Sequence, residues 1–298
     1  MTKLRITVVL LALVGALNSW SQGFGNRELI NADWYFNLGD IKYGGSEYFD
    51  HSEWRKLELP HDWSVEAVAS PELASCTGYL PGGIGWYRKD LDIPKVQNGN
   101  KVYIYFEGIY NNSEVFINGK WIGKRPNGYV SFMYELTPYL KFGGRNVLAV
   151  RVDHSQDADS RWYTGSGIYR DVYLVYANPV HIRLWGVSYS AKVNKKNAVL
   201  SVQTEVDNTG KLPVAVKVLH EVFDRDGKKV GAGSLDYSLR AGEMVKKELA
   251  VSIVQPKLWS LEDPYLYTIR TTLSKGGKVI DRTETRAGIR SLTFDPNK

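Results

Sequence analysis

Residues 160–172 read Ser-Arg-Trp-Tyr-Thr-Gly-Ser-Gly-Ile-Tyr-Arg-Asp-Val, and this stretch decides how the whole chain is interpreted. Its first half is typical of a loop, because two glycines and two small hydroxyl residues follow a pair of aromatic residues. Glycine allows φ > 0 and a close approach of the backbone to another surface. We therefore expect Gly165 and Gly167 to add little to fold stability and to let the loop approach a partner surface. From residue 168 to 176, β-branched and aromatic residues predict a strand.

The loop presents Arg161, Trp162 and Tyr163 as candidate site residues. A guanidinium beside aromatic rings suits a sugar, because sugars offer hydroxyls to hydrogen-bond donors and C–H faces to rings. The alternative is that these aromatic side chains fill the seam between two domains. Composition alone favours that alternative, since a single short motif carries a high risk of a false match.

The pattern Ser-Arg-Trp-Tyr-x-Gly-x-Gly-Ile-Tyr-Arg resembles a signature of glycoside hydrolase family 2, which contains β-galactosidases, β-glucuronidases and β-mannosidases. Other motifs of that family follow in its order, namely Leu-Pro-His-Asp-Trp at 59–63, Gly-Trp-Tyr-Arg-Lys at 85–89 and Gly-Ile-Arg at 288–290. The resemblance covers nearly all of the chain after its first residues. It implies a sugar-binding domain at residues 25–180 and an immunoglobulin-like domain at residues 181–298.

Strand signals along residues 25–180 predict a β-sandwich. Alternating apolar residues favour strands at 101–107 and 146–152, and Gly128 to Phe132 also has strand composition. Asn118-Gly119 lies between two apolar segments and predicts a tight hairpin, because a type I′ turn needs φ > 0 at both central residues. The long series of strands favours a jelly roll. The fold class predicted is all-β, a jelly-roll sandwich followed by a second sandwich.

Residues 181–298 contain seven short strand signals separated by turns, which is typical of an immunoglobulin-like sandwich. The predicted strands cover residues 182–189, 198–206, 214–223, 229–235, 244–253, 266–273 and 278–284. Trp259, Tyr265 and Tyr267 could be a second sugar platform, but strand aromatics mostly fill sandwich cores. We therefore expect these three side chains to be packed.

The N-terminus predicts export. Lys3 and Arg5 precede an apolar run at residues 6–17, which is shorter than the roughly 20 residues that span a bilayer. We expect a signal peptide at residues 1–21, with cleavage after Ser21, in preference to a membrane anchor. The expected location is the periplasm or the extracellular space, with no membrane attachment after cleavage.

Charge and cysteine content exclude several classes of function. The 298 residues carry a net charge of +6 with 38 basic residues scattered among 32 acidic ones, so no nucleic-acid partner is expected. Cys76 is the only cysteine, which allows no internal disulfide and no cysteine pair for a metal. We expect no metal and no cofactor.

Two further motifs are tempting as active-site elements. His61-Asp62 has no Gly-x-Ser-x-Gly nucleophile partner, so we interpret it as a structural corner. The run Gly82-Gly83-Ile84-Gly85 resembles a family loop where some β-galactosidases place a sugar-contacting Asn, but Gly82 stands at that position here. That contact is therefore not transferred to this chain.

The resemblance implies catalysis by a (β/α)₈ barrel with two glutamates about 5–5.5 Å apart, one of which follows an asparagine. This chain has no Asn-Glu pair, so we expect its catalytic residues to be none and the barrel to lie in the same or a neighbouring polypeptide. Arg161 stands where glucuronidases and many galactosidases of this family have Asp. Family members with Arg-Trp-Tyr at this place are often galactosidase-like, so the resemblance favours a β-galactoside. Two other interpretations are a free carbohydrate-binding module and a structural adaptor.

Overall fold

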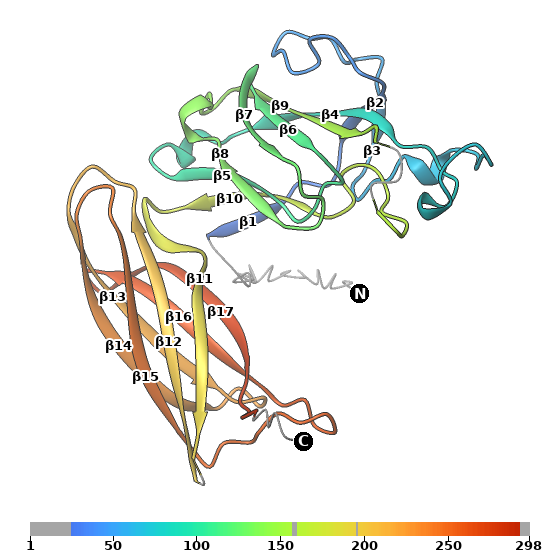
Figure 1. The fold of residues 1–298 in the computed structure, drawn as a ribbon. Helices are drawn as coiled ribbons and strands as arrows, with labels where there is room; N and C mark the ends of the chain where they lie inside the picture. The colour runs from blue at the N-terminus through green and yellow to red at the C-terminus, as the bar shows by residue number, and fades with distance from the viewer. Residues whose placement is uncertain (1–24, 157–159, 195, 293–298) are drawn as a thin grey trace, which may run out of the picture.

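The computed structural model describes residues 25–156, 160–194 and 196–292, which form two antiparallel β-sandwiches (Figure 1). Helical structure in this part of the chain is limited to short 3₁₀ turns. The predicted all-β fold, with a jelly-roll sandwich followed by an immunoglobulin-like sandwich, is confirmed. The predicted signal peptide lies outside the described residues.

The first sandwich packs a six-stranded sheet, ordered β3-β2-β4-β9-β6-β7, on a four-stranded sheet, ordered β1-β10-β5-β8. The six-stranded sheet contains β2 (Trp34–Leu38), β3 (Arg55–Leu57), β4 (Gly83–Asp92), β6 (Ser113–Ile117), β7 (Lys120–Arg125) and β9 (Arg145–His154). The four-stranded sheet contains β1 (Asn26–Leu29), β5 (Lys101–Phe106), β8 (Phe132–Glu135) and β10 (Val172–Ala177). Successive strands often change sheet, as β9 and β10 do.

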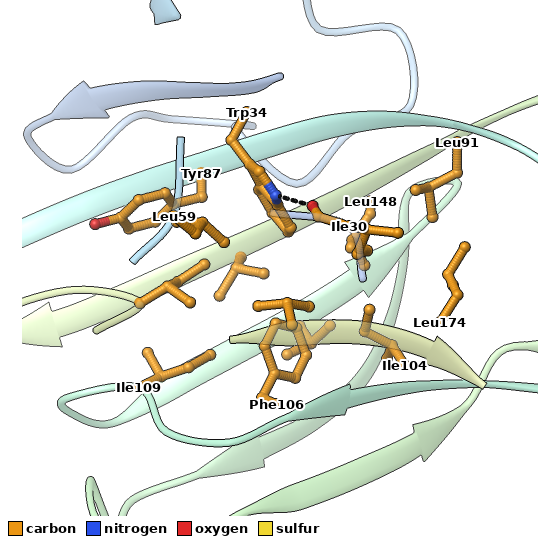
Figure 2. Packing of buried hydrophobic residues seen from close by; sticks show 14 of the residues in the cluster. Ile30, Trp34, Leu59, Tyr87, Leu91, Ile104, Phe106, Ile109, Leu148 and Leu174 are labelled. Carbon is orange, nitrogen blue, oxygen red and sulfur yellow. Dashed lines mark hydrogen bonds between the residues drawn. The ribbon is translucent and has the colours of Figure 1, made fainter. Parts of the chain in front are cut away.

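Apolar side chains between these two sheets form the largest core of the protein (Figure 2). Trp34, Tyr87 and Phe106 are fully buried there. The indole Nε1 of Trp34 donates to the carbonyl of Ile30 at 2.7 Å, so the polar end of this buried ring is paired. The alternation in residues 101–107 places Val102, Ile104 and Phe106 in this core, while Tyr103 and Tyr105 on the other face are also buried, so β5 is covered on both faces.

Asn118-Gly119 joins β6 and β7 with φ of 48° and 78°, as a tight hairpin requires. The predicted strand at residues 128–132 is wrong, because β8 begins only at Phe132. A side chain at Gly128 would meet the ring of Tyr110 at 2.2 Å, and Asn127 Oδ1 accepts the N–H groups of Tyr129 and Val130 at 2.8 and 3.1 Å. Close packing and an Asn-capped turn are therefore found where strand pairing was predicted.

The second sandwich has the seven predicted strands; the one at residues 214–223 has the predicted bounds and the other six are longer than expected. They are β11 (Val180–Val193), β12 (Asn197–Asn208), β13 (Val214–Phe223), β14 (Lys229–Leu239), β15 (Met244–Val254), β16 (Leu266–Lys275) and β17 (Lys278–Gly288). The sheet β11-β12-β15 packs on the sheet β14-β13-β16-β17. Tyr265 and Tyr267 are buried in this core, which confirms their packing role.

The two sandwiches meet where the chain passes from β10 into β11. Tyr103 and Tyr105 on the outer face of the four-stranded sheet form a small apolar cluster with Leu184 of β11. His181 lies edge-on to Tyr103 with ring centroids 6.2 Å apart. Within the described part of the chain, no helix has the length and apolar character needed to cross a membrane.

Candidate functional site

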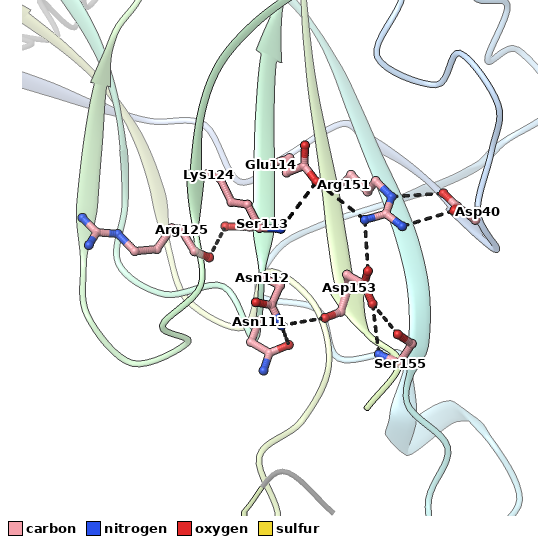
Figure 3. A network of polar contacts seen from close by, with 10 residues as sticks. All are labelled: Asp40, Asn111, Asn112, Ser113, Glu114, Lys124, Arg125, Arg151, Asp153 and Ser155. Carbon is pink, nitrogen blue, oxygen red and sulfur yellow. Dashed lines mark hydrogen bonds and ion pairs between the residues drawn. The ribbon is translucent and has the colours of Figure 1, made fainter. Parts of the chain in front are cut away.

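The candidate loop leaves β9 after His154 and returns to the fold before β10 (Figure 1). A polar network fixes the point of departure (Figure 3). The carboxylate of Asp153 accepts the N–H and the hydroxyl of Ser155 at 3.2 and 2.6 Å, and it also pairs with Arg151 at 3.1 Å. Asn112 Nδ2 donates to the carbonyl of Asp153 at 3.3 Å. The first residues of the loop are therefore held by the six-stranded sheet.

Asp62 holds the returning half of the loop. Its Oδ1 accepts the backbone N–H of Ser166 at 2.8 Å and that of Ser64 at 3.0 Å. Its Oδ2 accepts the hydroxyl of Tyr163. One carboxylate thus joins two segments that are about a hundred residues apart in the sequence, and both backbone donors belong to buried residues.

The glycines of the loop lie in its buried base and not at its exposed tip. Gly165 and Gly167 are buried, with φ of 72° and 126°. A side chain at Gly167 would lie 2.2 Å from Tyr87 Oη and 2.7 Å from the carbonyl of His61. Gly167 also exchanges two backbone hydrogen bonds of 2.9 Å with Tyr110. The expectation that these glycines add little to stability and approach a partner surface is therefore wrong.

The tip of the loop is exposed. Arg161 is exposed, and Trp162 and Tyr163 retain 59% and 43% of their surface. Trp162 Nε1 donates to the hydroxyl of Tyr129 at 2.9 Å. The alternative interpretation of Trp162 as a plug between the two described sandwiches does not fit this exposure. Arg161, Trp162 and Tyr163 are thus three consecutive exposed residues at the tip of the loop.

Tyr129 is a residue of the site that the sequence did not reveal. It keeps 44% of its surface exposed, and its ring lies edge-on to Tyr110 with centroids 5.4 Å apart. The only signal was its place after Asn127 in a turn, which is too common to indicate a binding surface. The structure therefore widens the candidate site to an aromatic platform of Tyr129, Trp162 and Tyr163 beside Arg161.

Electrostatics distinguish this platform from an acid–base centre. Burial, the hydrogen bond to Asp62 and the negative charge of Asp62 raise the pKa of the Tyr163 hydroxyl, so it stays neutral and bonded. Burial lowers the pKa of His61, although Glu66 nearby acts in the opposite direction. His61 Nδ1 is 2.7 Å from Tyr87 Oη inside the core. The interpretation of His61-Asp62 as a structural corner is confirmed.

A second histidine, His154, also makes a contact inside the fold. Ser166 Oγ lies 2.6 Å from His154 Nδ1 and 2.6 Å from Ser64 Oγ. Ser166 is fully buried, so a substrate could not reach its hydroxyl. No group of three or more His, Cys, Asp or Glu side chains that could hold a metal occurs among residues 25–156, 160–194 and 196–292. The site is suited to binding a polar ring, through one guanidinium and three aromatic side chains.

Comparison with known proteins identifies the class. The family description "Glycosyl hydrolases family 2, sugar binding domain" matches residues 29–179, and "Glycosyl hydrolases family 2" matches residues 180–290. The chain therefore belongs to glycosyl hydrolase family 2, as its motifs indicate.

Two relatives with known names are similar to this chain over 91% of its length. The chain is 42% identical over 275 residues to beta-galactosidase BoGH2A of Bacteroides ovatus, covering 91% of this chain and 32% of that protein. It is 31% identical to a beta-glucuronidase of Bacteroides fragilis, covering 91% of this chain and 38% of that protein. The chain thus spans about a third of the length of these relatives.

Solved structures agree with this assignment. A family 2 member from Bacteroides cellulosilyticus superposes with a TM-score of 0.83 at 34% identity, covering 90% of this chain and 37% of that one. A beta-glycosidase from Bacteroides vulgatus gives 0.81 at 40% identity, covering 91% and 35%.

Proposed function

We propose that this chain is the non-catalytic N-terminal portion of an exported, β-galactosidase-like family 2 hydrolase. In this role it supports glycoside hydrolysis by a (β/α)₈ barrel in the same or a neighbouring polypeptide. The observation that carries the proposal is the exposed tip of Arg161, Trp162 and Tyr163 on a base fixed by Asp62. Rigid support and an exposed polar and aromatic tip are what positioning a sugar requires. The name of the Bacteroides ovatus relative supports a β-galactoside as the substrate.

The test joins this chain to a family 2 barrel and measures kcat/KM with an aryl β-galactoside. Arg161→Ala should lower kcat/KM by about tenfold or more, because a hydrogen bond from a charged group contributes about 1.5–3 kcal/mol. Trp162→Ala should also lower it. The melting temperature should stay unchanged in both variants, because the two side chains are exposed.

Trp121→Ala is the matched control, because Trp121 is 56% exposed on the β6–β7 hairpin and Trp162 is 59% exposed on the loop. It should leave kcat/KM unchanged. Wild-type kinetics in Arg161→Ala and Trp162→Ala, with the fold intact, would remove the substrate-edge role.

The chain alone should not hydrolyse chromogenic β-galactosides, β-glucuronides or β-mannosides. Turnover that survives repurification and disappears when one acidic residue is replaced would contradict this part of the proposal. Glycan binding by the isolated chain through Trp162, without any effect on a joined barrel, would instead indicate a free carbohydrate-binding module.

Export is the remaining part of the proposal. Mass spectrometry of the secreted or periplasmic protein should find Gln22 at or next to the mature N-terminus. A chain that begins at Met1 or Thr2 in the purified protein would contradict it.

A further inference from the structure

A polar and aromatic cleft lies between the two sandwiches, on the outer face of the four-stranded sheet. Its volume is about 440 Å³. Residues from β1, β5, β11 and β17, or directly after them, line it, among them Arg27, Tyr105, Glu107, Trp185, Glu284 and Arg286. Cavities of this size hold small ligands in other proteins, where about 300–1,000 Å³ is usual.

Trp185 is directed into this cleft by an irregularity in β11. The register of β11 against β12 shifts between Ile182 and Val187, so the residues between them form a bulge. Trp185 has φ of 55° and keeps 65% of its surface exposed. A left-handed backbone costs a residue other than glycine roughly 1–2 kcal/mol. Bulges of this kind re-aim a side chain, here away from its own sheet.

The bulge keeps its shape through close packing. A side chain at Gly186 would lie 2.8 Å from the carbonyl of Arg183 and 3.1 Å from that of Glu205. Leu184 packs against the first sandwich, while the next residue, Trp185, lies open in the cleft. The fold therefore holds a large apolar ring exposed at a fixed position, on a backbone in the left-handed region.

A buried ring and a cation stand next to Trp185 at the base of the cleft. Tyr105 lies edge-on to Trp185, with ring centroids 6.3 Å apart and an interplanar angle of 66°. The guanidinium of Arg27 lies 4.6 Å from the centroid of Tyr105 and 5.8 Å from that of Tyr173. Arg27 Nε is buried and has no hydrogen-bond partner within the described part of the chain. A ligand beside these rings could accept from this guanidinium.

Carboxylates complete the polar lining. Glu284 accepts from Arg270 Nε at 2.8 Å, which fixes one of its oxygens, and Glu107 stands on the other side of the cleft. Arginine side chains offer only donors and ionised carboxylates offer only acceptors, so both hydroxyl hydrogens and hydroxyl oxygens can be paired. The mixture of three arginines and two glutamates favours a neutral ligand rich in hydroxyls.

We propose that this cleft is a second carbohydrate-binding site, which holds a neutral sugar ring against the exposed ring of Trp185, supported edge-on by the buried Tyr105, and pairs the sugar hydroxyls with Arg27 and Glu107. The site is made only of residues of this chain and requires no barrel. It is built from other segments than the platform of Tyr129, Trp162 and Tyr163. The proposal therefore stands or falls independently of the proposed role of the Arg161 loop.

The test uses the purified full chain on an array of neutral galactan, xylan, mannan and β-glucan oligosaccharides, followed by titration with the best binder. Trp185→Asn is the variant of choice, because Asn adopts left-handed backbone angles more readily than other residues do. The bulge should persist and the melting temperature should not fall, while affinity should drop at least tenfold. Arg27→Met and Glu107→Gln should each weaken binding several-fold. Trp121→Ala is the matched control, because Trp121 is 56% exposed and lies outside both candidate sites, and it should bind like the wild type.

Three results would overturn the proposal. The first is that no array member binds the wild-type chain. The second is that Trp162→Ala abolishes binding while Trp185→Asn does not, which would place the sugar on the Arg161 loop. The third is that Trp185→Asn binds sugar normally but lowers the activity of a joined barrel, which would make the cleft a protein contact surface. If Trp185→Asn fails to fold, the Arg27 and Glu107 variants decide by the same criterion.

Discussion

Replacing Asp62 with Ala tests whether the candidate loop is held by one carboxylate. Asp62→Ala leaves the buried N–H groups of Ser64 and Ser166 without their acceptor and also removes the bond from Tyr163. A buried donor without a partner costs about 1–3 kcal/mol, and the bond from exposed Tyr163 adds about 0.5–1.5 kcal/mol. Water can enter the space left by this half-buried side chain, so we expect about 3 kcal/mol in total.

Thermal unfolding of the full chain, followed by tryptophan fluorescence, measures this loss, because most tryptophans lie in the first sandwich. A loss of about 3 kcal/mol should lower the melting temperature by roughly 6–12 °C for a domain of this size. Tyr163→Phe removes a single bond and should lower the melting temperature by no more than about half of that amount. Asp50→Ala is the control, because Asp50 is exposed and accepts from Ser52 at 2.9 Å in a local turn. Equal melting temperatures for Asp62→Ala and Asp50→Ala would refute the reasoning.

Three further substitutions test other parts of the fold. Gly167→Ala should lower the free energy of unfolding, measured by chemical denaturation, by about 2–5 kcal/mol, because it adds both backbone strain and a clash with Tyr87. The control is Gly227→Ala, which has φ of 78° and open space around it, so only the strain of about 1–2 kcal/mol should be lost. Burial lowers the pKa of His220 to about 4, because the folded protein favours the neutral ring. The neutral ring therefore contributes its full amount to the free energy of unfolding above pH 6.5, and about 3 kcal/mol is lost as the pH falls through 4. His220→Gln can keep the contacts to Thr204 and Thr271 and should flatten that part of the urea-measured pH dependence; an unchanged slope would contradict the assignment. Arg88 is fully buried and donates to the carbonyls of Gly44, Ser46 and Phe49. Arg88→Lys should lower the free energy of unfolding by about 3 kcal/mol and expose residues 44–51 to protease, because an ammonium cannot reach all three acceptors. Unchanged protease resistance would show that Lys can replace the guanidinium.

Local patterns in the sequence predicted several strands of the first sandwich and all seven of the second, because alternation and turn residues act over a few positions. The Asn118-Gly119 hairpin and all seven strands of the second sandwich follow from such signals. The strand predicted at residues 128–132 failed for a non-local reason. Gly128 is required by the ring of Tyr110, which lies well before it in the sequence. Strand composition alone does not reveal that contact.

The candidate site likewise combines residues that a local motif identifies with residues that only the fold brings together. Arg161, Trp162 and Tyr163 are neighbours in the chain, so a motif could identify them. Asp62 and Tyr129 reach the loop only through the fold, across sequence separations of 104 and 33 residues. The role of the glycines was misjudged for this reason. Glycine signals a close approach of the backbone, but the sequence does not say whether the approaching surface belongs to the same domain or to a partner.

Exposed tryptophans show how structure separates a binding residue from an incidental one. Trp34, Trp63 and Trp86 are buried, as expected for a ring whose burial stabilises a core by about 2–3 kcal/mol. Trp121, Trp162 and Trp185 are all more than half exposed, so exposure alone does not distinguish them. Their surroundings do. Trp162 is bonded to Tyr129 and follows Arg161 in the chain, and Trp185 projects from a strained bulge into a polar cleft, where it contacts Tyr105 edge-on. The side chain of Trp121 makes no hydrogen bond within the described residues. A ring in solvent binds a sugar well only if its position is fixed and donors and acceptors stand beside it, because ordering both partners otherwise consumes the gain. Trp162 and Trp185 meet that condition at two separate places and Trp121 does not, which is why Trp121 serves as the control for both.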